Sequence, residues 1–127
     1  MIDAGGGGSV APVGCVVVTT TVGSAEVAEG LARSIVDGRL AACVHVVPIR
    51  SVYRWQGEIC AEPEWRCEAK TTDERAGALI EHIRANHGYH LPEIVAIPIS
   101  GSEDYLAWVA AESAESTEST ESAESAP

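Results

Sequence analysis

The chain has 127 residues and a formal net charge of −11 at pH 7. A chain of this length favours one domain, and its acidic balance excludes a basic surface for nucleic acid or for an anionic membrane. The sequence has no apolar run near the roughly 18 residues that a membrane span needs, and no basic segment followed by an apolar one, as in a signal peptide. We therefore expect a soluble cytoplasmic protein without a nucleic-acid or membrane partner.

Both ends of the chain differ in composition from the middle. Residues 1–12 are rich in glycine, and residues 112–127 are a low-complexity run of Ala, Glu, Ser and Thr that ends in proline. Neither segment has enough apolar side chains to offset the entropy lost on ordering. We predict a flexible leader over residues 1–12, one folded domain over residues 13–111 and a disordered acidic tail over residues 112–127.

The first predicted elements are a strand and a helix. Residues 15–21 are apolar or β-branched on successive positions, as expected for a strand covered on both faces. Apolar side chains then recur at helical spacing from Val27 to Val36. Ser24 suits the N-cap of this helix, and Gly38 suits a left-handed cap at its end.

A long antiparallel hairpin is predicted next, with its turn at Gln56-Gly57. Its arms are residues 39–55 and 65–72, and residues 58–64 form a polar connection. Pro48 cannot donate to a ladder, so we expect a bulge, a bend or a sheet edge there. Arms of this length extend beyond the helices of a small domain, and their open edges need another strand. The expected supplier is another copy of the chain.

The second half of the chain repeats the helix–strand alternation. Thr71 and Glu74 form a capping-box pattern for a helix that ends near Asn86. A strand over residues 93–99 follows, and Ser102 opens a short third helix. The order of elements predicts an α+β fold, the ferredoxin-like split βαβ sandwich with a short C-terminal helix. In this plan two helices cover one face of a four-stranded antiparallel sheet.

Five short motifs resemble, in order and spacing, those of the CutA divalent-cation tolerance proteins: Leu40-Ala41-Ala42-Cys43, residues 51–57, Lys70-Thr71-Thr72, residues 87–93 and residues 104–108. The resemblance covers roughly residues 16–109. It implies a cytoplasmic homotrimer of ferredoxin-like subunits, shaped like the PII signalling proteins, with a link to tolerance of copper and other divalent metals. Of the metal ligands proposed in the family, the resemblance carries over His87, whereas threonines stand where some members have a copper-linked cysteine.

His87 and His90 are the candidate metal ligands. Together with Glu93 they offer the imidazole and carboxylate groups that suit Cu(II), Zn(II) or Ni(II), although we expect no cofactor to be required. Alternatively, a histidine at the end of a helix simply favours the helix dipole. Among the thiols, Cys43 and Cys67 are expected in the core, and only Cys60 is expected to be exposed enough to meet a soft metal.

A cleft between subunits is the second candidate site, because pockets with a few convergent polar groups often lie at such places. The residues expected to line it are Tyr53, Trp55, Lys70, Tyr89 and Glu93. In the alternative interpretation the aromatic side chains pack the subunit interface and Lys70 makes an ion pair.

Two functions fit these patterns. The first is a non-enzymatic homotrimer that acts in divalent-metal tolerance and binds Cu(II) weakly. The second is a PII-like signalling module that binds a small anion or a nucleotide between subunits. An enzyme of the acylphosphatase type would need an arginine in the loop after the first strand, and residues 20–24 contain none. The sequence also shows no nucleophile with a partnered base.

Overall fold

The computed structural model describes residues 14–115, so the predicted leader and most of the predicted acidic tail lie outside the described residues. The elements are β1 (Cys15–Val22), α1 (Ala25–Asp37), β2 (Cys43–Trp55), β3 (Glu58–Thr72), α2 (Asp73–Ala85), β4 (Ile94–Ile99) and α3 (Glu103–Ser113). No helix among these residues is long and apolar enough to cross a membrane.

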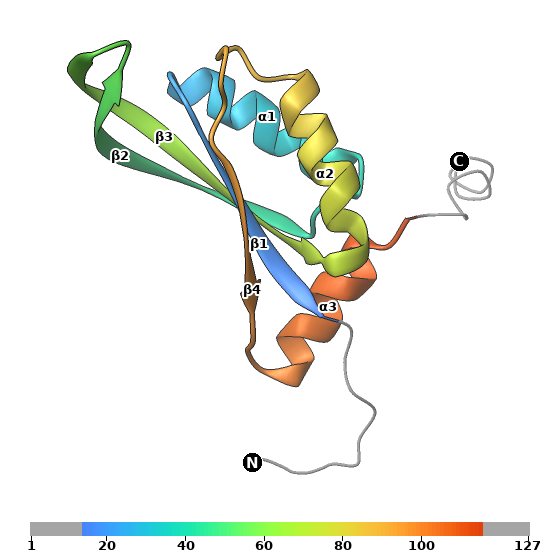
Figure 1. Cartoon of the computed structure of the whole chain (residues 1–127). Coiled ribbons are helices and arrows are strands. Elements are labelled where there is room, and N and C mark those ends of the chain that lie inside the picture. Colours follow the sequence, from blue (N-terminus) through green and yellow to red (C-terminus); the bar gives the residue numbers. More distant parts are fainter. Residues whose placement is uncertain (1–13, 116–127) are drawn as a thin grey trace.

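The strands form one antiparallel sheet in the order β2-β3-β1-β4, with α1 and α2 on one face (Figure 1). This confirms the ferredoxin-like split βαβ plan, in which β1 and β3 occupy the centre. The core lies between the sheet and the two helices, where Val18, Ile35 and Leu79 are fully buried. Side chains alternate between faces along a strand, so Cys15 points the other way and packs with Leu106 and α3 in a second cluster.

The hairpin of β2 and β3 is longer than predicted. Gln56 and Gly57 have φ values of 52° and 82° and make the two-residue turn, as the sequence indicated. The predicted polar connection over residues 58–64 is wrong, because these residues pair with β2 from Trp55 onward and belong to β3. Backbone pairing across this short turn outweighs the poor strand propensity of the glutamates. Pro48 lies in β2, which is uninterrupted and forms an edge of the sheet, as one of the expected alternatives had it. Proline has no backbone N–H, and an edge strand tolerates this because one of its sides has no neighbouring strand.

The end of α1 differs from the prediction in one residue. Gly38 has φ −83° and is not left-handed, whereas Arg39 has φ 57°. A non-glycine residue in this region is strained by roughly 1–2 kcal/mol. The guanidinium of Arg39 offsets that strain, because it donates to the carbonyl oxygens of Ala111 and Ala114 at 2.9 and 3.0 Å. The strained residue therefore joins the end of α1 to the end of α3.

The start of α2 is also displaced by one residue. Thr72, not Thr71, is the N-cap, and its side chain accepts from the backbone N–H of Arg75 at 3.3 Å. Thr71 is still part of β3 and is completely buried. Helix α3 begins after its predicted cap Ser102 and runs through Ser113, so it includes the first two residues assigned to the tail.

Arg75 makes a second connection to the end of α3. Its guanidinium donates to the carbonyl oxygens of Ser113 and Arg39, both at 3.0 Å. Last-turn carbonyls of a helix have no partner within the helix, and α3 has no basic residue of its own in that turn. Arg39 and Arg75 thus supply the donors that hold α3 against the sheet.

Replacement of Arg75 by methionine should lower the free energy of unfolding by about 1.5–3 kcal/mol, because it leaves helix-end carbonyls unpaired. Chemical denaturation measures this loss. The matched control is Arg33→Met, which removes an exposed i,i+4 ion pair with Glu29 and should cost under about 0.5 kcal/mol. Equal effects of the two changes would show that Arg75 does not hold α3.

Candidate functional site

The candidate site is a cavity of about 800 Å³ lined by residues of the hairpin and of the loop between α2 and β4. The hairpin and this loop lie at the same end of the sheet (Figure 1). We call it the Glu64 pocket. Strand alternation places Ser51, Tyr53 and Trp55 of β2 on one face of the hairpin, together with Glu62 and Glu64 of β3. The full lining is Thr21, Arg50, Ser51, Val52, Tyr53, Trp55, Glu62, Glu64, Gly88, Tyr89, His90, Leu91 and Glu93.

Glu64 is the buried charged group of this pocket, with 7% of its surface exposed. Its Oε1 accepts from the hydroxyl of Ser51 at 2.6 Å, and its Oε2 accepts from the hydroxyl of Tyr89 at 2.7 Å. These short distances are those of hydrogen bonds to an ionised carboxylate. Within residues 14–115, Glu64 makes no ion pair. Among residues 14–115, the side-chain partners of this carboxylate are therefore two hydroxyls and no ion-paired cation.

His87 fixes the loop that carries Tyr89. Its Nδ1 accepts the backbone N–H of Tyr89 at 3.0 Å, and its Nε2 lies 2.7 Å from the carbonyl oxygen of Thr21. A carbonyl oxygen only accepts, so Nε2 carries the proton, and the lone pair of Nδ1 is used by Tyr89. The imidazole also stacks obliquely on the Tyr89 ring, with centroids 4.8 Å apart. His87 is thus a positioning residue for Tyr89 in this structure.

The tyrosines of the pocket hold their protons strongly. Burial raises the pKa of Tyr89, and the hydrogen bond to Glu64 raises it further. Desolvation, followed by the hydrogen bond and charge of Glu62, raises the pKa of Tyr53. Outside the pocket, the hydrogen bond with Cys43, followed by burial, raises the pKa of Tyr105 to about 12. Tyr89 therefore remains a hydrogen-bond donor at neutral pH.

The structure brings most of the predicted site residues together. Tyr53, Trp55, Tyr89, Glu93 and the predicted metal ligand His90 line the pocket, and His87 supports it from behind. Lys70 does not line it. It is six positions from Glu64 along β3, about 20 Å at the usual rise per residue, and its Nζ lies 3.4 Å from Nδ1 of His45. Its predicted place in a cleft between subunits stays a prediction.

Sequence reasoning missed Glu64 and Ser51. Glu64 was assigned to a loop, where a carboxylate is ordinarily solvated. The signal that could have found it is the alternation of residues 62, 64, 66 and 68, which continues the pattern of the recognised part of the strand. Ser51 lies in the predicted arm of the hairpin, but only the pairing register places it beside Glu64.

The thiols and the metal candidates give no closed site. In the part of the chain that the structure describes, no three His, Cys, Asp or Glu side chains converge closely enough to hold one metal ion. Cys67 is buried as predicted, and burial raises its pKa. Cys43 was expected in the core but is half-buried, with Sγ 3.5 Å from the hydroxyl of Tyr105. Cys60 is half-buried in β3, not in an exposed connection.

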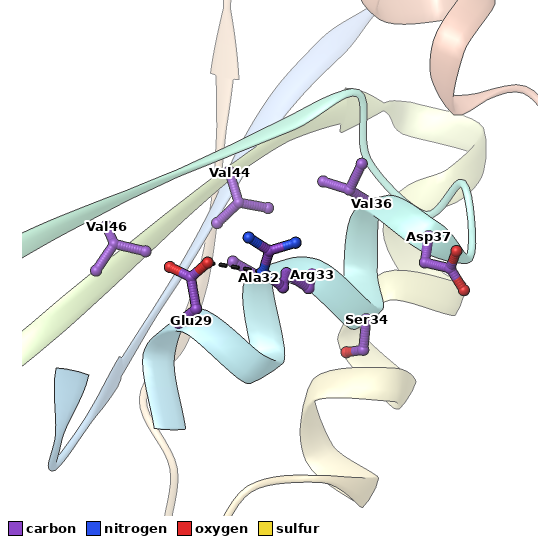
Figure 2. A pocket seen from close by; sticks show the side chains of 8 residues that line it. All are labelled: Glu29, Ala32, Arg33, Ser34, Val36, Asp37, Val44 and Val46. Carbon is purple, nitrogen blue, oxygen red and sulfur yellow. Dashed lines mark hydrogen bonds and ion pairs between the residues drawn. The ribbon is translucent and has the colours of Figure 1, made fainter. Parts of the chain in front are cut away.

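A second cavity, of about 670 Å³, lies between α1 and the edge strand β2 (Figure 2). Val36, Val44 and Val46 form its apolar side, and the ion pair of Arg33 with Glu29, at 2.7 Å, lies across its polar side. Arg33 and Glu29 are exposed and paired with each other, and the third charged residue of the lining, Asp37, is exposed as well, so this cavity holds no buried charged group. The Glu64 pocket remains the candidate site.

The fold and the pocket define a class: small ferredoxin-like proteins with an uncovered sheet face and a polar pocket at the hairpin. A family model described as CutA1 divalent ion tolerance protein matches residues 16–112. The chain belongs to this family.

Its relatives include bacterial and plant proteins. The chain is 47% identical over 95 residues to the divalent-cation tolerance protein CutA of Thermus thermophilus, covering 73% of this chain and 92% of that protein. It is 45% identical to the chloroplastic protein CutA of Arabidopsis thaliana over 74% of this chain, and it spans 53% of that longer relative.

Solved structures agree with this assignment. The crystal structure of CutA1 from Oryza sativa superposes with a TM-score of 0.78 at 42% identity, covering 83% of this chain and 98% of that one. The structure of the PII-like protein CutA from Nostoc sp. superposes with a TM-score of 0.75 at 30% identity, covering 79% and 98%.

Alkaline titration should test the hydrogen bond between Tyr89 and Glu64. A tyrosine whose pKa is raised by folding contributes stability that is present below about pH 10 and is lost as pH rises above it. Tyrosinate absorbance of the folded protein should therefore appear at higher pH than in the urea-unfolded chain. In Tyr89→Phe the tyrosine that ionises at the highest pH should be missing. The loss of folding stability at alkaline pH should also be smaller. Tyr105→Phe is the control, because it leaves Glu64 untouched.

Proposed function

We propose that this protein is a non-enzymatic homotrimer that acts in the tolerance of divalent metal ions. Family membership supports the tolerance role, and the distribution of apolar surface supports the assembly. We further propose that it works in the cytoplasm, since Cys43, Cys60 and Cys67 carry free thiols, as in a reducing compartment.

The observation that carries the proposal is the sheet face opposite α1 and α2. Helix α3 covers only one end of it, where Cys15 and Leu106 pack. Elsewhere apolar side chains face outward, including Ile97 of β4 at 49% exposure and Trp108 of α3 at 43%. Beyond the helices, the hairpin also exposes Val52 and Ile59, at 68% and 69%, on its other face. Both β2 and β4 also have an open edge. Such edges and apolar faces favour association of identical chains.

Light scattering should give a mass three times the 13.3 kDa of one chain. Ile97→Glu should shift the protein toward monomer, because a carboxylate on the uncovered face cannot be buried without a partner. The control is Val27→Glu, which changes a residue of equal exposure, 51%, on the outer side of α1 and should leave the mass unchanged. A monomeric parent protein with an intact hairpin would contradict the assembly.

Weak Cu(II) binding, predicted from the sequence at His87 and His90, is part of the proposal, with His90 as the principal ligand. His90 lines the pocket and has no hydrogen bond to another described residue, so its imidazole is available, and Glu93 lies in the same lining. His87 must first break its bond to the N–H of Tyr89 before Nδ1 can bind a metal. The residues present do not form a closed metal site, so a dissociation constant typical of structural metal sites is not expected.

Calorimetric titration with Cu(II) tests whether His90 binds the metal and His87 chiefly stabilises the fold. His90→Ala should abolish the weak binding, whereas His87→Ala should chiefly lower the free energy of unfolding by about 1–2 kcal/mol through loss of two hydrogen bonds. His82→Ala, which removes a half-buried histidine of α2 outside the pocket, hydrogen-bonded to Ser34, is the control. Equal copper binding by the parent and the His90 variant would remove His90 from the proposal.

A second candidate function is a PII-like module that binds a small ligand in the Glu64 pocket. The pocket itself favours it, because its aromatic walls and convergent polar groups are typical of small-molecule sites. One solved relative is itself described as PII-like. For this chain, the sequence-based choice of an anion or a nucleotide as the ligand stays a prediction.

A further inference from the structure

The net charge of the Glu64 pocket indicates whether its ligand is an anion or a cation. Its described lining has three carboxylates, Glu62, Glu64 and Glu93, against one guanidinium, Arg50, which leaves a net charge of −2 with His90 neutral. A phosphate or another anion placed there would be repelled by all three carboxylates. A positively charged ligand would be attracted by the same groups.

Glu64 makes the stronger case because it is buried. A buried carboxylate is ordinarily paired with a cation, and the described residues offer Glu64 two hydroxyls but no ion pair. Each of its oxygens accepts one hydrogen bond and retains a lone pair that can accept another. An ammonium group in the cavity would supply both the missing positive charge and the missing donor.

The aromatic lining fits the rest of such a ligand. Tyr53 and Trp55 stand on the same face of β2 as Ser51, and their exposures of 39% and 40% leave ring surface open to the cavity. Aromatic faces attract ammonium groups and also pack against methylene groups. The same carboxylates do not converge on one point, so a compact metal ion is a poorer match than a molecule that reaches several of them.

We propose that the Glu64 pocket binds a small organic cation with primary ammonium groups, and not a nucleotide or another anion. The inference rests on the second candidate function above, that this pocket is a ligand site, and it names the ligand class. Glu64 binds one ammonium group, and Glu62 or Glu93 binds a second at the mouth of the cavity. The full protein, in whatever assembly it adopts, is the form that binds.

Titration of Trp fluorescence and calorimetry with putrescine, a four-carbon diamine, tests the proposal. Saturable binding is expected for putrescine, with none for 1,4-butanediol, which has the same length without charge, and none for ATP. Glu64→Gln should weaken putrescine binding about 10- to 100-fold, as expected for loss of a charge-assisted hydrogen bond. Glu93→Gln, at an exposed position, should weaken it less, and it serves if the Glu64 variant is poorly folded. Glu81→Gln removes the same charge from the outside of α2 and should leave binding unchanged.

The outcomes separate this inference from the proposals before it. Binding of ATP but not putrescine overturns the ligand class and supports the anion-binding module. A trimer that binds neither compound also overturns it while leaving the assembly intact. If Glu64→Gln lowers the trimer fraction and putrescine does not bind, another copy of the chain satisfies the carboxylate, which again overturns it. If Glu64→Gln and Glu81→Gln lose putrescine affinity equally, the loss comes from the change in net charge, which would contradict a specific site.

Discussion

The continuous pairing of β2 with β3 is the constraint on which the site depends. The two-residue turn at Gln56 and Gly57 sets the register, and that register runs unbroken from Trp55 and Glu58 to Cys43 and Lys70. A slip by one residue would turn every side chain of one strand to the other face. Ser51 would then no longer meet Glu64, and the buried carboxylate would lose one of its two donors. The turn chemistry therefore decides the chemistry of the pocket.

The loop after α2 completes what the hairpin begins. His87 uses both ring nitrogens to tie this loop to β1, through the carbonyl of Thr21, and to orient Tyr89 toward Glu64. The histidine expected from the family resemblance as a metal ligand thus has a structural task in the folded chain. Since the imidazole is already engaged, the weak Cu(II) binding that we propose depends on His90.

The other end of the sheet is organised for packing. Arg39 and Arg75 place their guanidinium groups on the last carbonyls of α3, and this helix seals the end of the sheet face that α1 and α2 leave uncovered. The remainder of that face presents apolar side chains outward. The Glu64 pocket lies at the hairpin end of this same face, because Glu64 points to the opposite side of β3 from Cys67, which packs in the core under the helices. The pocket lies where the hairpin projects beyond the helices, so assembly and binding can affect each other.

The sequence by itself determined the element order, the turn at Gln56-Gly57, the caps at Ser24 and Ser102, and the family, because these depend on local propensity and on motifs in register. It also singled out Tyr53, Trp55, Tyr89, His90 and Glu93, since aromatic and ionisable side chains in a loop and a hairpin indicate a site. Only the tertiary structure decided that Glu64 belongs to a strand and is buried, because backbone pairing with β2 overrides the local preference of a glutamate-rich segment. It also decided that Arg39 takes the left-handed position, since the compensating contacts come from residues more than seventy positions away in the sequence. Long-range contacts of this kind produce no periodic pattern in the sequence, and they decide that the carboxylate of Glu64 is buried.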